Sequence, residues 1–506
     1  MHRCLRLPEL VGLVCSHLQS PYHLEIALEV RQPKRGDLAV LARTSTVFSS
    51  HALRLLWESV TLINLLRCLP SDSFEIRTTG EGYFTKYMMQ LLRPLRSSDW
   101  ERVLVYAQFV KHLSSDPDFA DLSPVFPSIS KNMLPNLQGL HWMHREKDFQ
   151  YIDCFLAPQL TTIRIPHTSL DALSLLSSLA LRCPQLTNIT LFPRSAPDLQ
   201  PLAVSAVSIC VRGLHGIETL ITDMVDEPAL EHLSRLSGVR HLRLGELPPT
   251  LPAVPTDDVA LFPSLQTLYF SSEIESPTRF LEWGNKLPLV EFTTECRAFS
   301  TADEVHRLFS AASGGISHLP LTGFAFDDEF GSLDSSHPAN YLIRPQSLRS
   351  LFCFVNLTSV SILSAVGIDL DDTTVTDMAR SWRHIECLEL QSYYGNAAPR
   401  ATLQCLEAFP KYCPHLTKLS ITFDATVIPT SQSDLSLACL KNLDVEASPI
   451  STALPVARFL ARMFPSLKNI STLRDSLDGE DEWEEDVGPE AIQYDPQWKE
   501  VESMLH

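Results

Sequence analysis

The stretch LSGVRHLRL, residues 236–244, carries the pattern that decides the fold. Val239, Leu242 and Leu244 give the spacing L-x-x-L-x-L, with a valine in the first position. Successive side chains of a β-strand point to opposite faces, so Leu242 and Leu244 are expected to face one core. Proline or glycine usually stands just before the pattern, where a turn leads into the strand. The stretch therefore predicts a short strand with one buried face.

The same pattern recurs from residue 133 onwards, for example in APQLTTIRI (157–165) and CPHLTKLSI (413–421). Its first apolar residue stands at positions 137, 160, 186, 217, 239, 265, 289, 316, 357, 385, 416, 440 and 467. Most steps are 22 to 31 residues, and the long step from 316 to 357 leaves room for a further unit at SLRSLFCF (347–354). A strand followed by a helix at this period is the signature of leucine-rich repeats.

Helix-like segments stand between the units. TSLDALSLLSSLALRC (168–183) has Ser169 or Asp171 near its start as an N-cap, and DDTTVTDMARSW (371–382) is a second example. We expect an α/β fold in which residues 126–474 form a leucine-rich-repeat solenoid, with parallel strands on the concave face and helices on the convex face. Leucine-rich repeats usually have Asn or Cys three residues after the last leucine of the pattern. These repeats lack it, and Leu247 stands at that position in the fifth unit. An ordinary α/β domain with leucine-rich strands is the alternative.

Residues interleaved with the core leucines point to the concave face of such a solenoid. Such residues either contact a protein target or are solvated surface residues. The candidates for target contacts are His141, Arg164, Arg243, Tyr269, Glu389 and Lys418, and Thr190 and Asp444 occupy equivalent positions.

Composition and charge exclude several classes of protein. The 506 residues are 44% hydrophobic, so the chain can bury a large core. The net charge is −19. We therefore expect no binding to nucleic acid, because its phosphate backbone needs a basic protein surface. Residues 475–506 hold twelve acidic residues and only one basic residue, Lys499, and are expected to form a disordered tail. In the QWKEVESML segment of that tail, Trp498, Val501 and Leu505 share a helical face that either docks on the last repeats or stays loose.

Motifs for enzymes, cofactors and metals are missing from the sequence. It contains no GxGxxG, GxxxxGK[ST] or GxSxG motif, and glycine is scarce at 18 residues. His141 and His144 stand three apart without further ligands, and the twelve cysteines form no CxxC pair. The cysteines therefore suggest buried thiols in a reducing compartment. We expect no cofactor, no metal, no catalytic residue and no membrane span, and a cytoplasmic or nuclear location.

The segment CLRLPELVGLVCSHL (4–18) predicts a helix with two apolar faces. Val11, Val14, Cys15 and Leu18 follow helical spacing, and Leu10 and Leu13 widen the apolar surface beyond one stripe. One stripe is enough to pack a small domain, so the second face suggests a partner. A second helix is expected at LAVLARTS after the cap residue Asp37, and a third at SSHALRLLWESV (49–60), with Ser49 or Ser50 as its cap.

LPEL (7–10), DLAVLARTSTVF (37–48) and LLW (55–57), in this order, resemble an F-box, although residues 19–36 lengthen the loop after its first helix. The resemblance implies a three-helix module over residues 1–57 that docks on a Skp-type adaptor, which joins it to a cullin–RING ubiquitin ligase. The adaptor-binding residues it implies are Leu7, Pro8, Glu9, Leu10, Val14, Leu18, Leu38, Leu41 and Trp57. TLINLLRCLP (61–70) and RPLRSSDWERVLVYAQFVKHL (93–113) resemble segments that follow the F-box in basidiomycete fungal F-box proteins, and predict a helical bridge over residues 58–125.

Together these features predict a non-catalytic substrate receptor of a Skp–cullin–F-box ligase, monomeric within the complex. Its F-box would hold the adaptor and its repeats would hold an unknown protein target. The alternative is a leucine-rich-repeat interaction scaffold outside any ligase, whose F-box-like start is only a helical cap on the solenoid.

Overall fold

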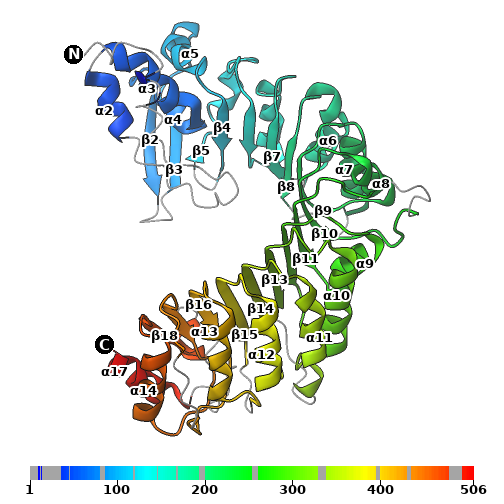
Figure 1. The fold of residues 1–506 in the computed structure, drawn as a ribbon. Coiled ribbons are helices and arrows are strands. Elements are labelled where there is room, and N and C mark those ends of the chain that lie inside the picture. The colour runs from blue at the N-terminus through cyan, green and yellow to red at the C-terminus, as the bar shows by residue number, and fades with distance from the viewer. Residues whose placement is uncertain are drawn as a thin grey trace. The chain divides into compact units, whose positions relative to one another are not determined.

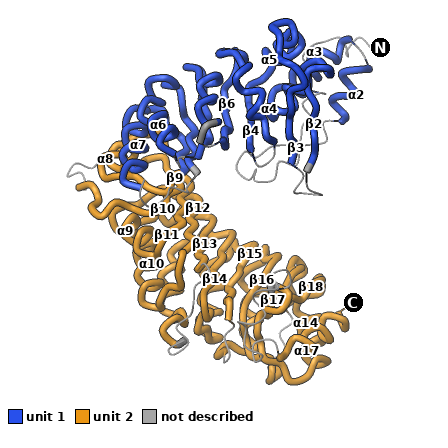
Figure 2. Tube along the Cα trace, turned by 180° about the vertical axis from the view of Figure 1, so that it is seen from behind, with its two compact units in different colours: residues 1–221 blue, residues 222–506 orange. Residues whose placement is uncertain are grey.

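The computed structural model describes most of the chain in two compact units, residues 1–221 and 222–506 (Figure 2). The described residues are 10–11, 13, 36–44, 46–79, 86–117, 120–144, 146–166, 169–192, 200–253, 260–328, 338–394, 399–429, 435–477 and 493–505. The fold is α/β, and a ladder of parallel strands runs through each unit (Figure 1).

In the first unit the ladder has the order β1-β4-β6-β7-β8-β9 among the described strands. Their bounds are β1 Ser59–Thr61, β4 His112–Ser115, β6 Gly139–Trp142, β7 Thr162–Pro166, β8 Asn188–Phe192 and β9 Thr219–Met224. Leu113, Leu140, Ile163 and Ile189 lie in consecutive register and are buried. They form one row of the core, as the L-x-L pattern predicts.

In the second unit the ladder runs from β10 to β18 in chain order. Its strands are β10 His241–Glu246, β11 Thr267–Ser272, β12 Glu291–Cys296, β13 Gly323–Asp328, β14 Ser359–Ser364, β15 Cys387–Ser392, β16 Lys418–Ser420, β17 Asn442–Asp444 and β18 Asn469–Ser471. From β6 onwards each strand begins two residues after its predicted anchor, with one exception. The predicted anchor is Ile316, because Ile316, Leu319 and Leu321 fit the spacing, but β13 follows Leu321 and places Phe324 and Phe326 in the core.

Helices pack against one face of each ladder. In the first unit these are α6 Leu170–Arg182 and α7 Gln200–Arg212. In the second unit they are α8 Glu227–Arg235, α9 Glu275–Trp283, α10 Ala302–Gly315, α11 Pro345–Arg349, α12 Asp372–Ser381, α13 Ala408–Tyr412 and α14 Ala453–Met463. Phe270 of β11 contacts Phe280 of α9 with ring centroids 5.5 Å apart, so these strands and helices share one core.

Side-chain caps start several of these helices where the sequence indicates. Ser169 accepts a hydrogen bond from the Ala172 amide at 3.3 Å, as predicted for α6. Asp371 accepts one from the Thr374 amide at 2.7 Å at the start of α12. The further repeat that we considered at SLRSLFCF is not a strand, because residues 345–353 form α11 and the 3₁₀ helix η9 Ser350–Cys353.

The N-terminal helices differ from the prediction in their starts. α2 Gly36–Thr44 begins before Asp37, which lies in its first turn, and α3 Thr46–Glu58 begins before Ser49 and Ser50. Neither predicted cap therefore stands at a helix start. Val11, Leu38, Phe48 and Ala52 form a small core, with Leu41, Ala42, Val47, Leu55 and Leu56 packed around it.

The expected helical bridge over residues 58–125 is wrong in its secondary structure. It contains α4 Leu62–Leu66, η4 Ser97–Trp100 and α5 Glu101–Ala107, but also β1, β4 and a small sheet of β2 Phe74–Thr79, β3 Lys86–Leu91 and β5 Ala120–Asp121. α5 ends at Ala107, and Leu113 lies in β4. Helical spacing is misleading here because the buried strand residue Leu113 falls in phase with Val103 and Val110 of the preceding segment. The ladder thus begins at residue 59, well before the expected start of the repeats.

For residues 475–506 we expect a disordered tail whose terminal helix either docks or stays loose, and the described parts of this segment are largely helical. α15 Leu473–Leu477 and α17 Asp495–Leu505 are helical, and residues 478–492 lie outside the described residues. Trp498 and Val501 are buried, so the terminal helix docks. Glu502 accepts a hydrogen bond from the Ile470 amide at 2.9 Å, so α17 supplies a partner to β18, the last strand of the ladder. The contact satisfies one amide of this strand.

Candidate protein-interaction site

The outward face of the ladder in the second unit gathers the sequence-predicted candidates in one register row. Arg243 pairs with Tyr269, and the row continues through Thr293, Ala325 and Ser361 to Glu389. Lys418 lies in the neighbouring row, opposite Cys387. All these positions alternate with buried core residues, so they lie on the face opposite the helices.

Arg243 and Tyr269 form a stacked pair at the start of this row. The guanidinium carbon of Arg243 lies 3.9 Å from the centroid of the Tyr269 ring, and Arg243 Nη2 donates to the Tyr269 hydroxyl at 3.1 Å. Burial, followed by a hydrogen bond to Glu295, raises the pKa of Tyr269, so the phenol stays neutral. An exposed guanidinium held flat on an aromatic ring is suited to contact a protein partner.

Two residues further along these strands, a second row of acidic and polar side chains lies on the same face, opposite the helices. Tyr393 donates to Asp327 Oδ1 at 3.1 Å, and Gln391 donates to Asp444 Oδ2 at 3.0 Å. Asp327 and Gln391 stand two residues beyond Ala325 and Glu389, as does Glu295 beyond Thr293. The sequence prediction missed Glu295, Asp327, Gln391 and Tyr393. Extending the two-residue alternation past the core leucines would have found them.

Three of the predicted contact residues in this unit, Lys418, Glu389 and Asp444, already have partners within the chain. The Lys418 ammonium forms an ion pair with Glu389, which raises the pKa of Lys418. Asp444 is only 7% exposed, and its Oδ2 accepts the hydrogen bond from Gln391. Arg243 and Tyr269 are likewise paired with each other, so internal pairing does not separate these candidates.

In the first unit, His141, Arg164 and Thr190 also share one row. Burial lowers the pKa of His141 to about 4, with a smaller contribution from Arg164, so the imidazole is neutral at pH 7. Ser114 Oγ lies 3.3 Å from His141 Nδ1. His144 lies in the core against Trp142, with its Nε2 2.8 Å from Ser115 Oγ. The two histidines of HWMH therefore have separate serine partners.

The residues implied for adaptor binding are divided between core and surface. Leu38 is 4% exposed inside the N-terminal core, which removes it from the set of possible contacts. Leu41 is partly buried against that core, and Trp57 stacks on Tyr106 with ring centroids 4.3 Å apart. Leu10 is 40% exposed. The remaining members of the set, Leu7, Pro8, Glu9, Val14 and Leu18, lie outside the described residues.

Within the described segments no group of three or more His, Cys, Asp and Glu side chains is arranged to hold a metal ion. None of the described helices is both long enough and apolar enough to cross a bilayer. The ten cysteines of the described segments are thiols, and burial raises the pKa of Cys413 to about 12 and that of Cys210 to about 12.

No protein-family model matches the chain, and no curated protein matches it. Among solved structures, the crystal structure of the Rad7 and Elc1 complex in yeast is similar at 12% sequence identity and a TM-score of 0.36. The similarity covers 93% of this chain and 94% of that chain. At this TM-score it carries no argument about function.

Proposed function

We propose that the chain is the substrate-recognition subunit of a Skp–cullin–F-box ubiquitin ligase. Its N-terminal helices would dock on a Skp-type adaptor, and the outward face of its strand ladder would hold a protein target. The chain contributes no catalytic step and acts as one copy in the cytoplasm or nucleus. It holds target lysines near a ubiquitin-conjugating enzyme, which raises their effective concentration.

The observation that carries this proposal is the two-sided N-terminal segment. Val11 is 0% exposed in the core with Leu38, Phe48 and Ala52, whereas Leu10 and Leu13 beside it are 40% and 55% exposed. Val40 of α2 is 52% exposed as well. Large apolar side chains gathered outside so small a core are typical of a protein-docking surface. The F-box resemblance of the same residues identifies the partner class.

Co-expression with a Skp-type adaptor, followed by pull-down, tests this proposal. The double variant Leu10→Asp, Leu13→Asp should lose the adaptor, because two charges would be buried without partners in the interface. Leu181→Asp is the matched control, since Leu181 is an 88% exposed leucine on α6. Both variants should keep the melting temperature of the wild type. Adaptor retention by the double variant, or absence of retention by the wild type, would contradict docking and favour the scaffold alternative.

A further inference from the structure

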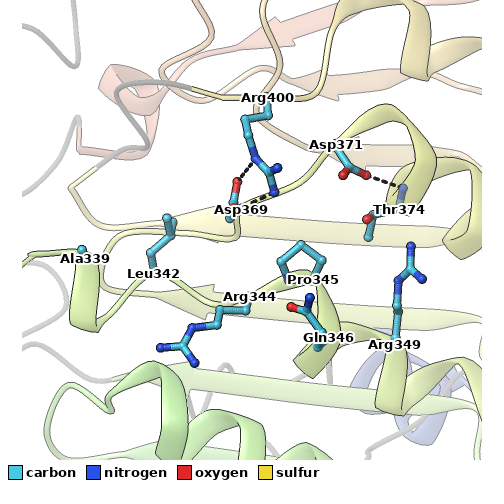
Figure 3. Close-up of a pocket in the computed structure, with 10 residues that line it drawn as sticks. All are labelled: Ala339, Leu342, Arg344, Pro345, Gln346, Arg349, Asp369, Asp371, Thr374 and Arg400. Atoms are coloured by element: carbon cyan, nitrogen blue, oxygen red, sulfur yellow. Dashed lines mark hydrogen bonds and ion pairs between the residues drawn. The ribbon is translucent and has the colours of Figure 1, made fainter.

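A pocket of about 480 Å³ lies in the second unit between three connections: the segment that leads into α11, the segment that leads into α12, and Arg400 after β15 (Figure 3). Each arginine of its lining already forms an ion pair within the chain: Arg344 with Asp303, Arg349 with Asp377 and Arg400 with Asp369. Asp371 accepts the hydrogen bond from the Thr374 amide that caps α12. The pocket therefore has no excess of positive charge.

The outward face of the ladder, in contrast, carries an excess of negative charge. No basic residue takes an outward position on the described strands β11 to β15, whereas four acidic ones do: Glu291, Glu295, Asp327 and Glu389. Glu295 and Asp327 are register partners on neighbouring strands, and Glu291 lies two residues before Glu295 on β12. Neighbouring strands lie about 4.8 Å apart. Glu291, Glu295 and Asp327 therefore form one acidic patch.

The basic residues around these strands do not cancel the acidic patch. Lys418 of β16 forms its ion pair with Glu389. Arg243 of β10 and Arg297 after β12 lie near Asp223 of β9, where they act against the rise in pKa that burial causes at Asp223. Three basic residues thus stand against five acidic ones when Asp223 is counted, so the excess on this face is negative.

Two carboxylates of the acidic patch are hydrogen-bonded to phenol groups. Tyr393 donates to Asp327 Oδ1 at 3.1 Å, and the Tyr269 hydroxyl is hydrogen-bonded to Glu295. Within the described segments, neither Glu291 nor Glu295 forms an ion pair. A phenol is a neutral donor, so it orients a carboxylate without removing its charge.

Aromatic rings lie beside the acidic patch. The ring centroid of Phe299 is 6.0 Å from that of Tyr393 and 5.8 Å from that of Tyr394. All three side chains are half-buried. Guanidinium and ammonium groups are attracted both to carboxylates and to the faces of aromatic rings. The combination is suited to cationic side chains of a partner.

Small side chains continue the same face on β13 and β14. The first two outward positions of these strands hold Gly323, Ala325, Ser359 and Ser361. Tyr269 and Glu389 stand at the two ends of the row that contains Ala325 and Ser361. Another backbone can approach a sheet closely where the side chains are small. An extended segment therefore fits across β13 and β14 between these larger side chains.

We propose that the outward face of β11 to β15 binds an extended basic segment of a protein partner, whose arginine or lysine side chains pair with Glu291, Glu295 and Asp327. Opposite charge favours this occupant over a neutral or acidic segment. The inference rests on the proposed function in one respect, since it concerns the face that would hold the target, and it identifies the chemistry of that target. It does not depend on adaptor docking.

Fluorescence anisotropy of the full chain with three rhodamine-labelled octapeptides, (Arg-Ser)4, (Gln-Ser)4 and (Glu-Ser)4, tests this inference. Only the arginine peptide should bind at submillimolar concentration, and added salt should weaken its binding. The double variant Glu295→Gln, Asp327→Asn should bind it about tenfold more weakly, because two opposite charges are lost. Both amides still accept hydrogen bonds from the phenols, so the melting temperature should stay that of the wild type.

The double variant Glu275→Gln, Glu282→Gln is the matched control. It removes the same charge from half-exposed positions on α9, on the opposite face of the sheet, and should bind as the wild type does. Ala325→Trp separates contact with this face from general attraction to a chain of net charge −19. It leaves the charge unchanged but covers the small side chains, so it should also weaken binding about tenfold.

Wild-type affinity of Glu295→Gln, Asp327→Asn or of Ala325→Trp would overturn the inference. Equal binding of the three peptides, or absence of binding by the arginine peptide, would overturn it as well. The adaptor pull-down is measured separately. Adaptor binding without peptide binding contradicts this inference alone, and peptide binding without adaptor binding contradicts the ligase role alone.

Discussion

Ser392 and Glu446 are joined by hydrogen bonds past the end of the short strand β16, although 54 residues separate them in sequence. The amide and the hydroxyl of Ser392 donate to Glu446 Oε2 at 3.2 Å and 3.1 Å. β16 ends at Ser420, which lies opposite Glu389, so Ser392 lies beyond the end of β16 and reaches the segment after β17 instead. Glu446 is 3% exposed, so its carboxyl is buried at this point.

Glu446 should make the stability of the chain depend on pH. Burial, followed by the nearby charge of Asp444, raises the pKa of Glu446 from 4.5 to about 8. Between these values the unfolded chain is ionised there while the folded chain keeps its proton, so the free energy of unfolding falls as pH rises from about 4.5 to about 8. The loss from this group is on the order of a few kcal/mol.

Urea unfolding of the wild type and Glu446→Gln at pH 5 and pH 8 measures this effect. The amide of the variant resembles the neutral carboxyl and cannot ionise. The difference between the two proteins should therefore shift in favour of the variant at pH 8, while titrating groups away from Glu446, such as Asp328, cancel in the comparison. A difference that is the same at both pH values would contradict the raised pKa.

Gly314 and Gly315 should respond oppositely to alanine, although they are neighbours at the end of α10. A Cβ on Gly315 would meet the backbone carbonyl oxygen of Leu281 in α9, whereas one on Gly314 would meet open space. Gly315→Ala should lower the free energy of unfolding by about 1–3 kcal/mol, because α9 and α10 would have to move apart. Gly314→Ala should raise it by up to about 1 kcal/mol through helix propensity. Equal effects in urea unfolding would show that the two helices do not approach each other as described.

The terminal helix should contribute substantially to the stability of the second unit. Trp498 is 1% exposed and donates from Nε1 to the Ser448 carbonyl oxygen at 2.8 Å. Trp498→Ala should lower the free energy of unfolding by about 3–5 kcal/mol. Met504→Ala on the same helix should change it by less than about 0.5 kcal/mol, because Met504 is 42% exposed. Similar small losses for both variants in chemical denaturation would mean that α17 is not part of the core.

The repeats could be predicted because the ladder places its core residues at fixed alternation. Large apolar residues at the core positions reveal most strands. The prediction is wrong at β13 because Ile316, Leu319 and Leu321 fit the same spacing as Leu321, Phe324 and Phe326, five residues further on. β1 and β4 were missed because the apolar spacing of residues 61–70 and 93–113 also fits a helix.

The candidate site could be predicted only in part. The outward row followed from alternation, which places Arg243 beside Tyr269 once the register is known. The bonds of Gln391 and Ser392 to the segment after β17 could not be predicted, because they depend on where β16 stops. The burial of Leu38 was missed because a short amphipathic helix does not show which apolar residue faces its own core and which faces a partner. The pocket joins three connections without a shared motif, so local sequence patterns give no signal for it.

Hydrogen exchange of the full chain, with and without a saturating Skp-type adaptor, tests the central claim most directly. The small core of Val11, Leu38, Phe48 and Ala52 offers little stability to α2 and α3, so their amides should exchange readily in the free chain. We predict that the adaptor slows exchange in residues 36–58 and leaves residues 260–328 of the ladder unchanged. Binding without added protection in α2 and α3, or protection of the ladder instead, would contradict the account.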